Sequence, residues 1–326
     1  MSGTVTQLFR YPVKSMGGHA LSSTSLTVKG IPGDRAWALK DEERGGIKGG
    51  KRFPGLLSMN ASFVSEPTAQ QVSPEVSIAL ADGRRISSSD HRVNEVLSAE
   101  VGAPVSLWPL LPEDQLDHYR RPAMEEGVDP EAYFREVFAR TEDEPLPDLS
   151  VFPEELFIYE SSPGTYFDAF PILLMSEASL NVFATTMTEK GEHSRFDLRR
   201  FRPNLVVETP EDGFPENSWV GRRGRIGSAV VKIEVACPRC VMTTHGFDDL
   251  PKDPKIMRHL VKENSGNLGV YLSIEEPGVI ALGDVIQWLD ARSAQLQAKK
   301  SALADANTPL SDTYGGLVAA GGHFAK

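Results

Sequence analysis

The sequence predicts an α+β fold that is mainly β. Apolar and polar residues alternate in the short stretches 58–63 and 76–80, as they do in strands with one buried face. Glycine and proline are dense between these stretches and mark turns. Helical periodicity occurs only in later segments, so the first part of the chain should form a β-barrel or sandwich and not a βαβ unit.

The N-terminal region, residues 1–110, is expected to be an all-β subdomain. Its stretch 76–80 runs into Asp82-Gly83, a dipeptide that favours the tight turn of a hairpin because both residues adopt positive φ readily. An earlier turn signal lies at residues 30–33, where two glycines flank Ile31-Pro32.

Residues 111–164 are predicted to connect two subdomains. Asp129-Pro130 is typical of a helix start, with aspartate as the N-cap and proline in the first turn. The helix should bury an apolar face made of Tyr133, Phe134, Val137 and Phe138. The acidic, proline-rich stretch 141–148 is expected to be extended. A lid over a pocket is the alternative role for a loop of this length.

Residues 165–290 are predicted to form a second domain of mixed structure. Ser176 is expected to cap one helix and Asp253-Pro254 to start another. The inward-facing residues of these helices should be Leu180, Phe183, Ala184 and Met187 in the first, and Ile256, Met257, Leu260 and Val261 in the second. Strands are expected at 205–207, 230–236, 270–274 and 279–289. The tail, residues 291–326, is rich in Ala, Ser and Gly and should be a short helix followed by disorder.

Composition excludes several functional classes. The chain has 326 residues and a formal charge of −11, which argues against non-specific binding to nucleic acid or to an anionic membrane. We see no apolar leader in the first residues, and the longest strongly apolar run, 170–175, is too short to span a bilayer. The cytoplasm is therefore the expected compartment.

The two cysteines of the chain lie together in the tetrad Cys237-Pro238-Arg239-Cys240. The alternating stretch 231–235 predicts a strand before the tetrad, and residues 241–246 show no helical period. A redox dithiol normally begins a helix whose dipole lowers the thiol pKa, so this role is disfavoured. Structural zinc is also disfavoured because there is no second cysteine pair. On spacing alone, the favoured interpretation is a pair of buried cysteines with only a structural role.

Cationic residues recur next to predicted strands of this acidic chain. They are Lys14, which is followed by Ser15, then Arg35, the group Arg199, Arg200 and Arg202, and Arg239 inside the tetrad. Each of them alone is usually a solvated surface charge. Together they are suited to bind an anionic, phosphate-bearing ligand beside a thiolate.

Five motifs, in order along the chain, resemble those of the MOSC family, which is named after the C-terminal domain of molybdenum cofactor sulfurase. They are Tyr11-Pro12-Val13-Lys14-Ser15, Gly33-Asp34-Arg35 with Trp37, Asp168 ahead of 171–180, Phe201-Arg202-Pro203-Asn204, and the tetrad followed by Thr243-Thr244. Within the family the chain resembles the mitochondrial amidoxime reducing component and its bacterial relatives, over about residues 4–290.

The resemblance implies a MOSC N-terminal β-barrel subdomain and a MOSC β-barrel core with peripheral helices. It implies that the molybdenum cofactor (Mo-molybdopterin) binds between them, with Cys240 as the catalytic molybdenum ligand and Cys237 not a ligand. The positions that match those holding the pterin and its phosphate are Lys14, Ser15, Arg35, Asp168, Arg202, Asn204 and Arg239. A thiolate is a soft donor suited to a metal already held by dithiolene sulfurs.

The activity that the resemblance implies is reduction of N-hydroxylated or N-oxide-type compounds by oxygen-atom transfer, without pyridoxal phosphate. The expected partners are a small N-oxygenated substrate and a separate soluble electron-donor protein, with no nucleic acid and no membrane. The alternatives are a sulfur (persulfide) carrier or transferase and a molybdenum-cofactor carrier. Two departures from the relatives concern the pocket: His245-Gly246-Phe247 replaces an apolar residue, aspartate and proline, and residues 113–163 form a longer connector.

Overall fold

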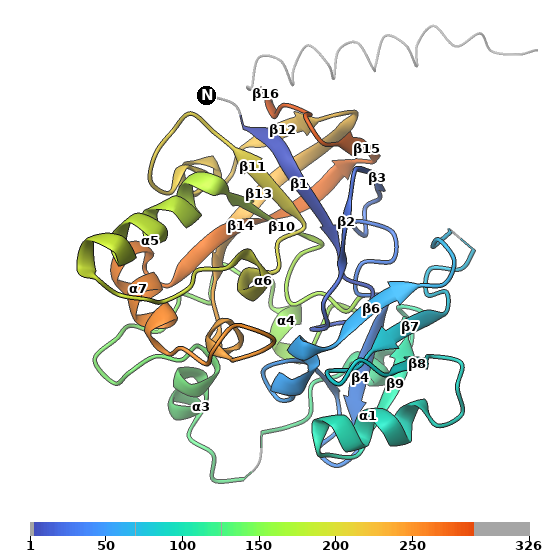
Figure 1. The fold of residues 1–326 in the computed structure, drawn as a ribbon. Coiled ribbons are helices and arrows are strands. Elements are labelled where there is room, and N and C mark those ends of the chain that lie inside the picture. Colours follow the sequence, from blue (N-terminus) through green and yellow to red (C-terminus); the bar gives the residue numbers. More distant parts are fainter. Residues whose placement is uncertain (1–2, 69, 125, 290–326) are drawn as a thin grey trace, which may run out of the picture. The chain divides into compact units, whose positions relative to one another are not determined.

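An eight-stranded sheet, to which the N-terminus contributes two strands, dominates the structure (Figure 1). The computed structural model describes residues 3–68, 70–124 and 126–289. The strand order is β16 (Gln287–Leu289), β12 (Arg223–Ile226), β13 (Ala229–Pro238), β14 (Asn267–Glu276), β10 (Ile172–Ser176), β11 (Leu205–Glu208), β1 (Thr4–Arg10) and β2 (His19–Leu21). Strands β10 and β11 are parallel, and β1 is antiparallel to both β11 and β2.

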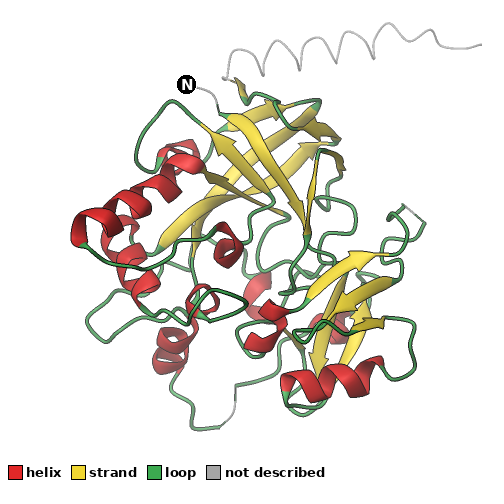
Figure 2. Ribbon diagram, in the orientation of Figure 1, coloured by secondary structure: helices red, strands yellow, loops and turns green. Residues whose placement is uncertain are grey.

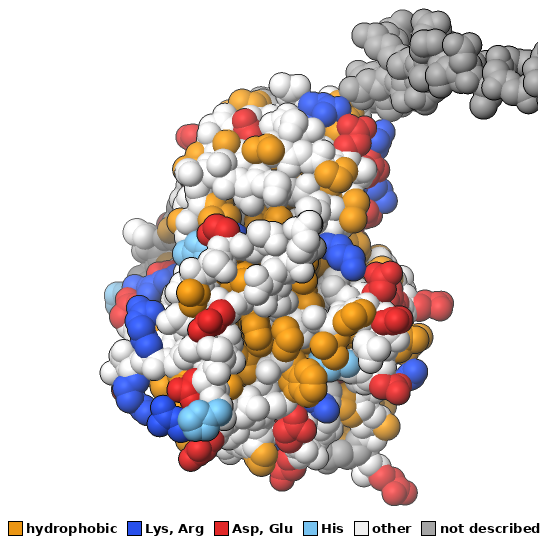
Figure 3. Space-filling view, turned by 90° about the vertical axis from the view of Figure 1, so that its right-hand side faces the viewer, with side chains coloured by type: hydrophobic (Ala, Val, Ile, Leu, Met, Phe, Trp, Pro, Cys, Tyr) orange, Lys and Arg blue, Asp and Glu red, His pale blue; other side chains and the backbone are white. Residues whose placement is uncertain are grey.

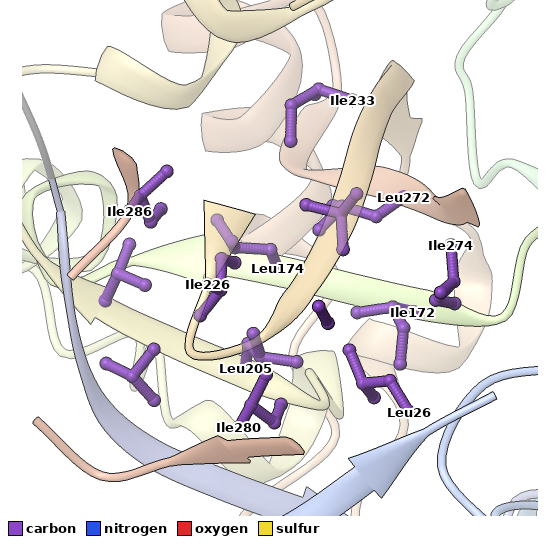
Figure 4. Close-up of a cluster of buried hydrophobic side chains, with 14 of the residues drawn as sticks. Leu26, Ile172, Leu174, Leu205, Ile226, Ile233, Leu272, Ile274, Ile280 and Ile286 are labelled. Carbon is purple, nitrogen blue, oxygen red and sulfur yellow. The ribbon is translucent and has the colours of Figure 1, made fainter. Parts of the chain in front are cut away.

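Backbone hydrogen bonds join the β16 end of this sheet to β1, the strand next to the other end. The Ile286 amide donates to the Gly3 carbonyl, and the Val5 amide donates to the Asp284 carbonyl, both at 2.8 Å. The chain next to β16 therefore pairs with the start of β1, and the sheet closes on itself as a barrel. Its interior is filled by aliphatic side chains that point toward one another, among them Leu174, Leu205 and Leu272, all fully buried (Figure 4). Strand β15 (Gly278–Ala281) pairs with β3 (Ser23–Leu26).

The N-terminal region adds two three-stranded sheets. One has the order β5 (Ile47–Lys48), β4 (Trp37–Asp41) and β9 (Val105–Pro109); the other has β6 (Asn60–Phe63), β7 (Val76–Ala79) and β8 (Arg85–Ser87). The hairpin predicted at Asp82-Gly83 joins β7 to β8, with Gly83 at φ 87°. A 3₁₀ helix, η1 (Pro54–Ser58), precedes β6. Helix α1 (Val93–Val101) was not predicted, although its buried Val93 and Leu97 have helical spacing and Gly102 ends it in the left-handed conformation.

The connector, residues 111–164, contains three short helices, α2 (Leu116–Tyr119), α3 (Pro130–Val137) and α4 (Glu155–Ile158). Asp129 caps α3 as predicted, by accepting from the Glu131 amide. The predicted apolar face of α3 is only partly covered: Phe138 is buried, whereas Tyr133 is exposed. The connector has 15 acidic and 4 basic residues, so its own formal charge is −11, which is also the formal net charge of the whole chain. The rest of the chain is therefore formally neutral.

Helices cover the outside of the large sheet (Figure 2). Helix α5 (Glu177–Lys190) is capped by Ser176 as predicted and buries Phe183 and Met187. The expectation for Ala184 was wrong, because this residue points to solvent. Helix α7 (Lys255–Asn264) buries Ile256, Met257 and Leu260 as expected. Short α6 (Leu198–Phe201) and the 3₁₀ helices η2 (Pro215–Trp219) and η3 (Val241–Thr244) complete the fold.

These elements confirm the α+β, mainly β fold class. The expected boundaries at residues 110 and 164 stay predictions, and the predicted tail, 291–326, lies outside the described residues. None of the helices in the described ranges has the length and apolar character needed to cross a bilayer. On the face seen in Figure 3, acidic and basic side chains are interspersed around a central group of hydrophobic ones.

Candidate active site

The predicted site residues lie at the ends of strands, in loops with unusual backbone conformations. Lys14 and Ser15 follow β1, Arg35 precedes β4, and Arg202 separates α6 from β11. Ser15, Arg35 and Arg202 have φ values of 68°, 51° and 56°, which are uncommon for residues with a Cβ. Backbone conformations of this kind are typical of functional sites, where the surrounding structure compensates for the strain.

Lys14 and Asp168 form an ion pair. The Lys14 Nζ is 2.8 Å from Asp168 Oδ1 and also donates to the Tyr166 carbonyl at 2.7 Å. Lys14 is buried, whereas the Asp168 side chain is 54% exposed. Desolvation alone would raise the pKa of Asp168, but the charges of Lys14, Lys51 and Arg35 outweigh it and lower that pKa. Asp168 is therefore a carboxylate at the open side of a cationic cluster.

A second carboxylate, Asp34, lies at the centre of the buried part of this cluster. Asp34 accepts from the Tyr11 amide at 2.8 Å, from Asn204 Nδ2 at 3.0 Å and from the Arg35 guanidinium. The amide oxygen of Asn204 accepts from the Leu173 amide at 3.2 Å. Both ends of the Asn204 side chain are thus bonded within the protein, and this geometry favours a role in positioning Asp34 and Arg35.

Arg202 is buried beside Tyr11 with an incomplete set of hydrogen bonds. Its guanidinium lies 4.2 Å from the centre of the Tyr11 ring, and the Tyr11 hydroxyl donates to the Pro203 carbonyl at 3.0 Å. The Arg202 Nη2 is buried and has no hydrogen-bond partner among the described residues. Burial lowers the pKa of Arg202 to about 10 and raises that of Tyr11 to about 12. A cation held in this way is set to receive an anion.

The two cysteines of the tetrad occupy different environments. Cys237 is buried, and its Sγ lies 3.0 Å from Arg239 Nη1. Burial raises the pKa of the Cys237 thiol. Cys240 is only partly buried and stands at the N-terminus of η3. No helix was predicted after the tetrad, whereas the structure has one short 3₁₀ turn there. Of the two sulfurs, Cys240 is the one that a ligand can reach.

Arg239 ties the tetrad to the neighbouring segments. Its Nη2 donates to the Phe201 carbonyl at 2.7 Å, and its backbone amide donates to the Gly266 carbonyl at 2.9 Å. The Arg239 Nε is buried and has no partner among the residues that the structure describes. Tyr11 and Cys240 both lie near enough for their charges to interact with that of Arg239.

A glycine-rich loop brings one more cation to Cys240. The Gly50 amide donates to Ser15 Oγ at 2.8 Å, and a Cβ on Gly50 would lie 3.0 Å from the Met242 sulfur. The next residue, Lys51, is exposed and interacts electrostatically with both Cys240 and Asp168. Ser15, the loop and the residues after Cys240 are therefore in direct contact.

The connector also reaches the tetrad. Arg140 is buried, and a Cβ added to Gly266 would lie 1.8 Å from the Nη2 of Arg140. Arg140 therefore packs against Gly266, whose carbonyl accepts from the Arg239 amide. Phe152 packs edge-on against Tyr271, which is hydrogen bonded to Cys237. The connector is therefore part of the support of the site.

A cavity of about 390 Å³ adjoins the cluster, and Tyr11 and Arg202 line it together with Phe9, Leu57 and Phe247. His245 lies near this region. Its Nε2 is buried without a partner among the described residues, and burial lowers its pKa.

All eight predicted site residues belong to one connected region, although Asn204 is turned inward. Sequence reasoning missed Tyr11, Asp34 and Lys51 as site residues. Tyr11 and Asp34 stand inside the motifs already singled out, which was the signal available for them. Lys51 follows a Gly49-Gly50 pair, and consecutive glycines often mark a close approach of backbone to another group.

Comparisons with known proteins identify two domains in the chain. The family model "MOSC N-terminal beta barrel domain" matches residues 2–99, and the model "MOSC domain" matches residues 162–287. "Mitochondrial amidoxime reducing component 2" of Bos taurus is 26% identical over 306 residues, covering 87% of this chain and 82% of its own.

"Molybdenum cofactor sulfurase" of Oryza sativa subsp. japonica is 26% identical over 71% of this chain and 27% of its own length. Among solved structures, the YUAD protein of Bacillus subtilis aligns with 88% of this chain and 96% of its own, with 13% identity and a TM-score of 0.37. The two family models account for the sequence on both sides of the connector, and the chain belongs to the MOSC domain family.

Proposed function

We propose that this protein is a molybdenum-cofactor-dependent oxidoreductase that reduces N-hydroxylated or N-oxide-type compounds. The observation that carries the proposal is the accessible Cys240 sulfur in a cluster whose buried guanidinium groups, on Arg202 and Arg239, have N–H donors without a partner among the described residues. The relatives that are named amidoxime reducing components support the same activity.

The residues of the cluster fit an anionic cofactor that brings its own metal. No group of three or more His, Cys, Asp or Glu side chains among the described residues is placed to hold a bare metal ion. A single thiolate that adds to a metal already bound by a pterin dithiolene needs no such group. Lys14, Arg35, Arg202 and Arg239 would receive the phosphate and the pterin oxygens, Ser15 would donate its hydroxyl, and Asp168 would accept from pterin N–H groups.

When bound, the cofactor supplies two-electron oxygen-atom transfer, the part of the chemistry that protein side chains cannot perform. In the net reaction the N–O bond of the substrate breaks, two electrons and two protons are taken up, and the amine or amidine and water are released.

The contribution of the chain is to position these groups. Cys240 presents its sulfur at the site, while Cys237, whose raised pKa keeps it a thiol, accepts the Arg239 N–H and fixes the tetrad. Asp34 and Asn204 hold Arg35 in place. Groups that are positioned before the reaction need little reorganisation during it.

The electrons would come from a separate soluble donor protein, and we propose no nucleic-acid or membrane partner. The cytoplasm is the compartment we propose, although the amidoxime-reducing relatives are named as mitochondrial.

A sulfur-carrier role is the second candidate, since the match to a molybdenum cofactor sulfurase covers most of this chain. In that role Cys240 would carry a persulfide, for which an accessible thiol beside cations is also suited. A third candidate is a carrier that delivers the cofactor unchanged to other proteins.

One set of measurements on purified protein distinguishes these roles. In a host with intact cofactor synthesis, we expect near-stoichiometric molybdenum and turnover of benzamidoxime with a chemical reductant. Cys240→Ser should lose most of the metal and all turnover, whereas Cys237→Ser should keep the metal. Molybdenum without turnover would indicate the cofactor carrier, and cyanide-releasable sulfur without molybdenum would indicate the persulfide carrier.

A further inference from the structure

Lys51 is a cation of the site that the cofactor-binding scheme above does not use. It extends from a loop that is held close to both halves of the cluster. A Cβ on Gly49 would lie 2.4 Å from Ser15 Oγ, and one on Gly50 would lie 3.0 Å from the Met242 sulfur. A side chain at either position would press on Ser15 or Met242, so the two glycines let the loop approach Ser15 and the segment after Cys240 closely. This contact fixes where the Lys51 side chain starts.

Lys51 follows directly on a loop that contacts Ser15 and Met242, the second residue after Cys240. Desolvation alone would lower the pKa of the Lys51 ammonium, but the Cys240 sulfur, and after it Asp168, outweigh this and raise that pKa. Lys51 itself is exposed, and within the described parts of the chain it forms no hydrogen bond or ion pair. The cations on the other side of the cluster, by contrast, are buried.

The nearby carboxylates are already paired with other cations. Asp168 accepts from Lys14 at 2.8 Å. Glu160 is bound by Lys48 and, at 2.9 Å, by Arg121, whose positive charge also faces Lys51. Once the Cys240 sulfur binds a metal, Lys51 has no unpaired anionic partner among the described residues. A free, exposed cation beside the reacting centre selects for an anionic group on the incoming molecule.

We propose that Lys51 is a specificity residue that receives an anionic group of the substrate at the open side of Cys240. The substrate class that follows is an N-oxygenated compound bearing a carboxylate or phosphate within reach of the N–O group. This inference rests on the proposed function, but the position of Lys51 beside Cys240 can be tested without it.

The first test uses cofactor-free protein and the rate at which Cys240 is alkylated. Iodoacetate is anionic and iodoacetamide is neutral, so the ratio of their rates reports the local electrostatic potential at the sulfur. Trypsin cleaves after Arg239, so adducts of Cys237 and Cys240 appear on separate peptides in mass spectrometry. Lys51→Gln should lower the ratio at Cys240 by about threefold to tenfold, since one unit charge at short range in a partly solvated site has an effect of this order.

Two variants control this measurement. Lys51→Arg should keep the ratio within about twofold of wild type, because it keeps the charge. Lys29→Gln removes another exposed lysine, whose charge is paired with that of Glu113. This variant should leave the ratio unchanged. An unchanged ratio in Lys51→Gln, with a wild-type circular dichroism spectrum and melting temperature, would overturn the placement of the charge.

The second test uses the loaded enzyme with benzamidoxime and 4-carboxybenzamidoxime. Lys51→Gln should raise KM for the carboxylated substrate about tenfold, keep KM for the neutral one within twofold, and leave the molybdenum content unchanged. Loss of molybdenum in Lys51→Gln would instead make Lys51 a cofactor ligand, and an equal change for both substrates would remove the specificity role. If wild-type protein reduces neither compound, the proposed function fails, while the alkylation ratio still decides whether Lys51 acts on Cys240.

Discussion

Arg202→Met is expected to reduce bound molybdenum more than tenfold and to leave the cofactor-free protein at least as stable as wild type. Arg202 is buried with Nη2 unpartnered among the described residues, and burial lowers its pKa to about 10. A buried charge without a full set of partners destabilises a fold, and a methionine of similar length removes that cost. A charge-assisted hydrogen bond to the cofactor phosphate is worth about 1.5–3 kcal/mol, so losing it weakens binding by tenfold or more. Metal analysis and urea unfolding of the cofactor-free protein measure the two effects.

Arg199→Met is the matched control, because it removes an arginine only three positions away. Arg199 is 45% exposed and is paired with Asp197 and Asp249, both at 2.8 Å. We expect this variant to retain wild-type molybdenum. The interpretation of Arg202 is wrong if Arg202→Met keeps its metal, or if the cofactor-free variant loses several kcal/mol of stability.

Asp34→Ala is expected to lower the free energy of unfolding by about 3–5 kcal/mol, as is typical when one partner of a buried ion pair is removed. Asp34 is 4% exposed and accepts hydrogen bonds from Tyr11, Arg35 and Asn204. Its removal leaves the Arg35 charge without its partner and leaves two buried N–H groups without acceptors. Urea unfolding followed by circular dichroism measures the loss.

Asp212→Ala provides the comparison for Asp34→Ala, because Asp212 is exposed. Its unfolding free energy should stay within about 0.5 kcal/mol of wild type, as expected for a surface substitution. Equal stability of the two variants would mean that Asp34 does not organise the cluster.

The sequence was sufficient to predict the fold class, several of the strands and the helices α3, α5 and α7. It did not predict strands such as β9, β10 and β12, and the expected strand 279–289 is two strands, β15 and β16. The alternating stretch 76–80 and Ser176 before α5 are local signals, and both correspond to the elements they predicted. Helix α1 was missed because a single nine-residue helix lay in a region dominated by strand patterns. The side of α5 that faces the core depends on tertiary packing, so the burial of Ala184 was predicted wrongly.

The same distinction between local and long-range signals applies to the site. The motif residues Lys14, Arg35 and Arg202 lie close to one another because each stands beside a strand end. The inward orientation of Asn204 was not predictable, because it depends on Asp34, 170 positions away. Lys51 was missed for the same reason: its neighbour Cys240 is brought near only by the contacts of Gly50 with Ser15 and Met242.

The proposed function depends on a bond between the Cys240 sulfur and molybdenum. X-ray absorption at the molybdenum edge counts the sulfur neighbours of the metal. To obtain enough loaded protein from the variants, each can be reconstituted with isolated cofactor. We predict that Cys240→Ser has one sulfur neighbour fewer than wild type and that Cys237→Ser has the same number as wild type. An equal number of sulfur neighbours in wild type and Cys240→Ser would show that Cys240 is not a molybdenum ligand.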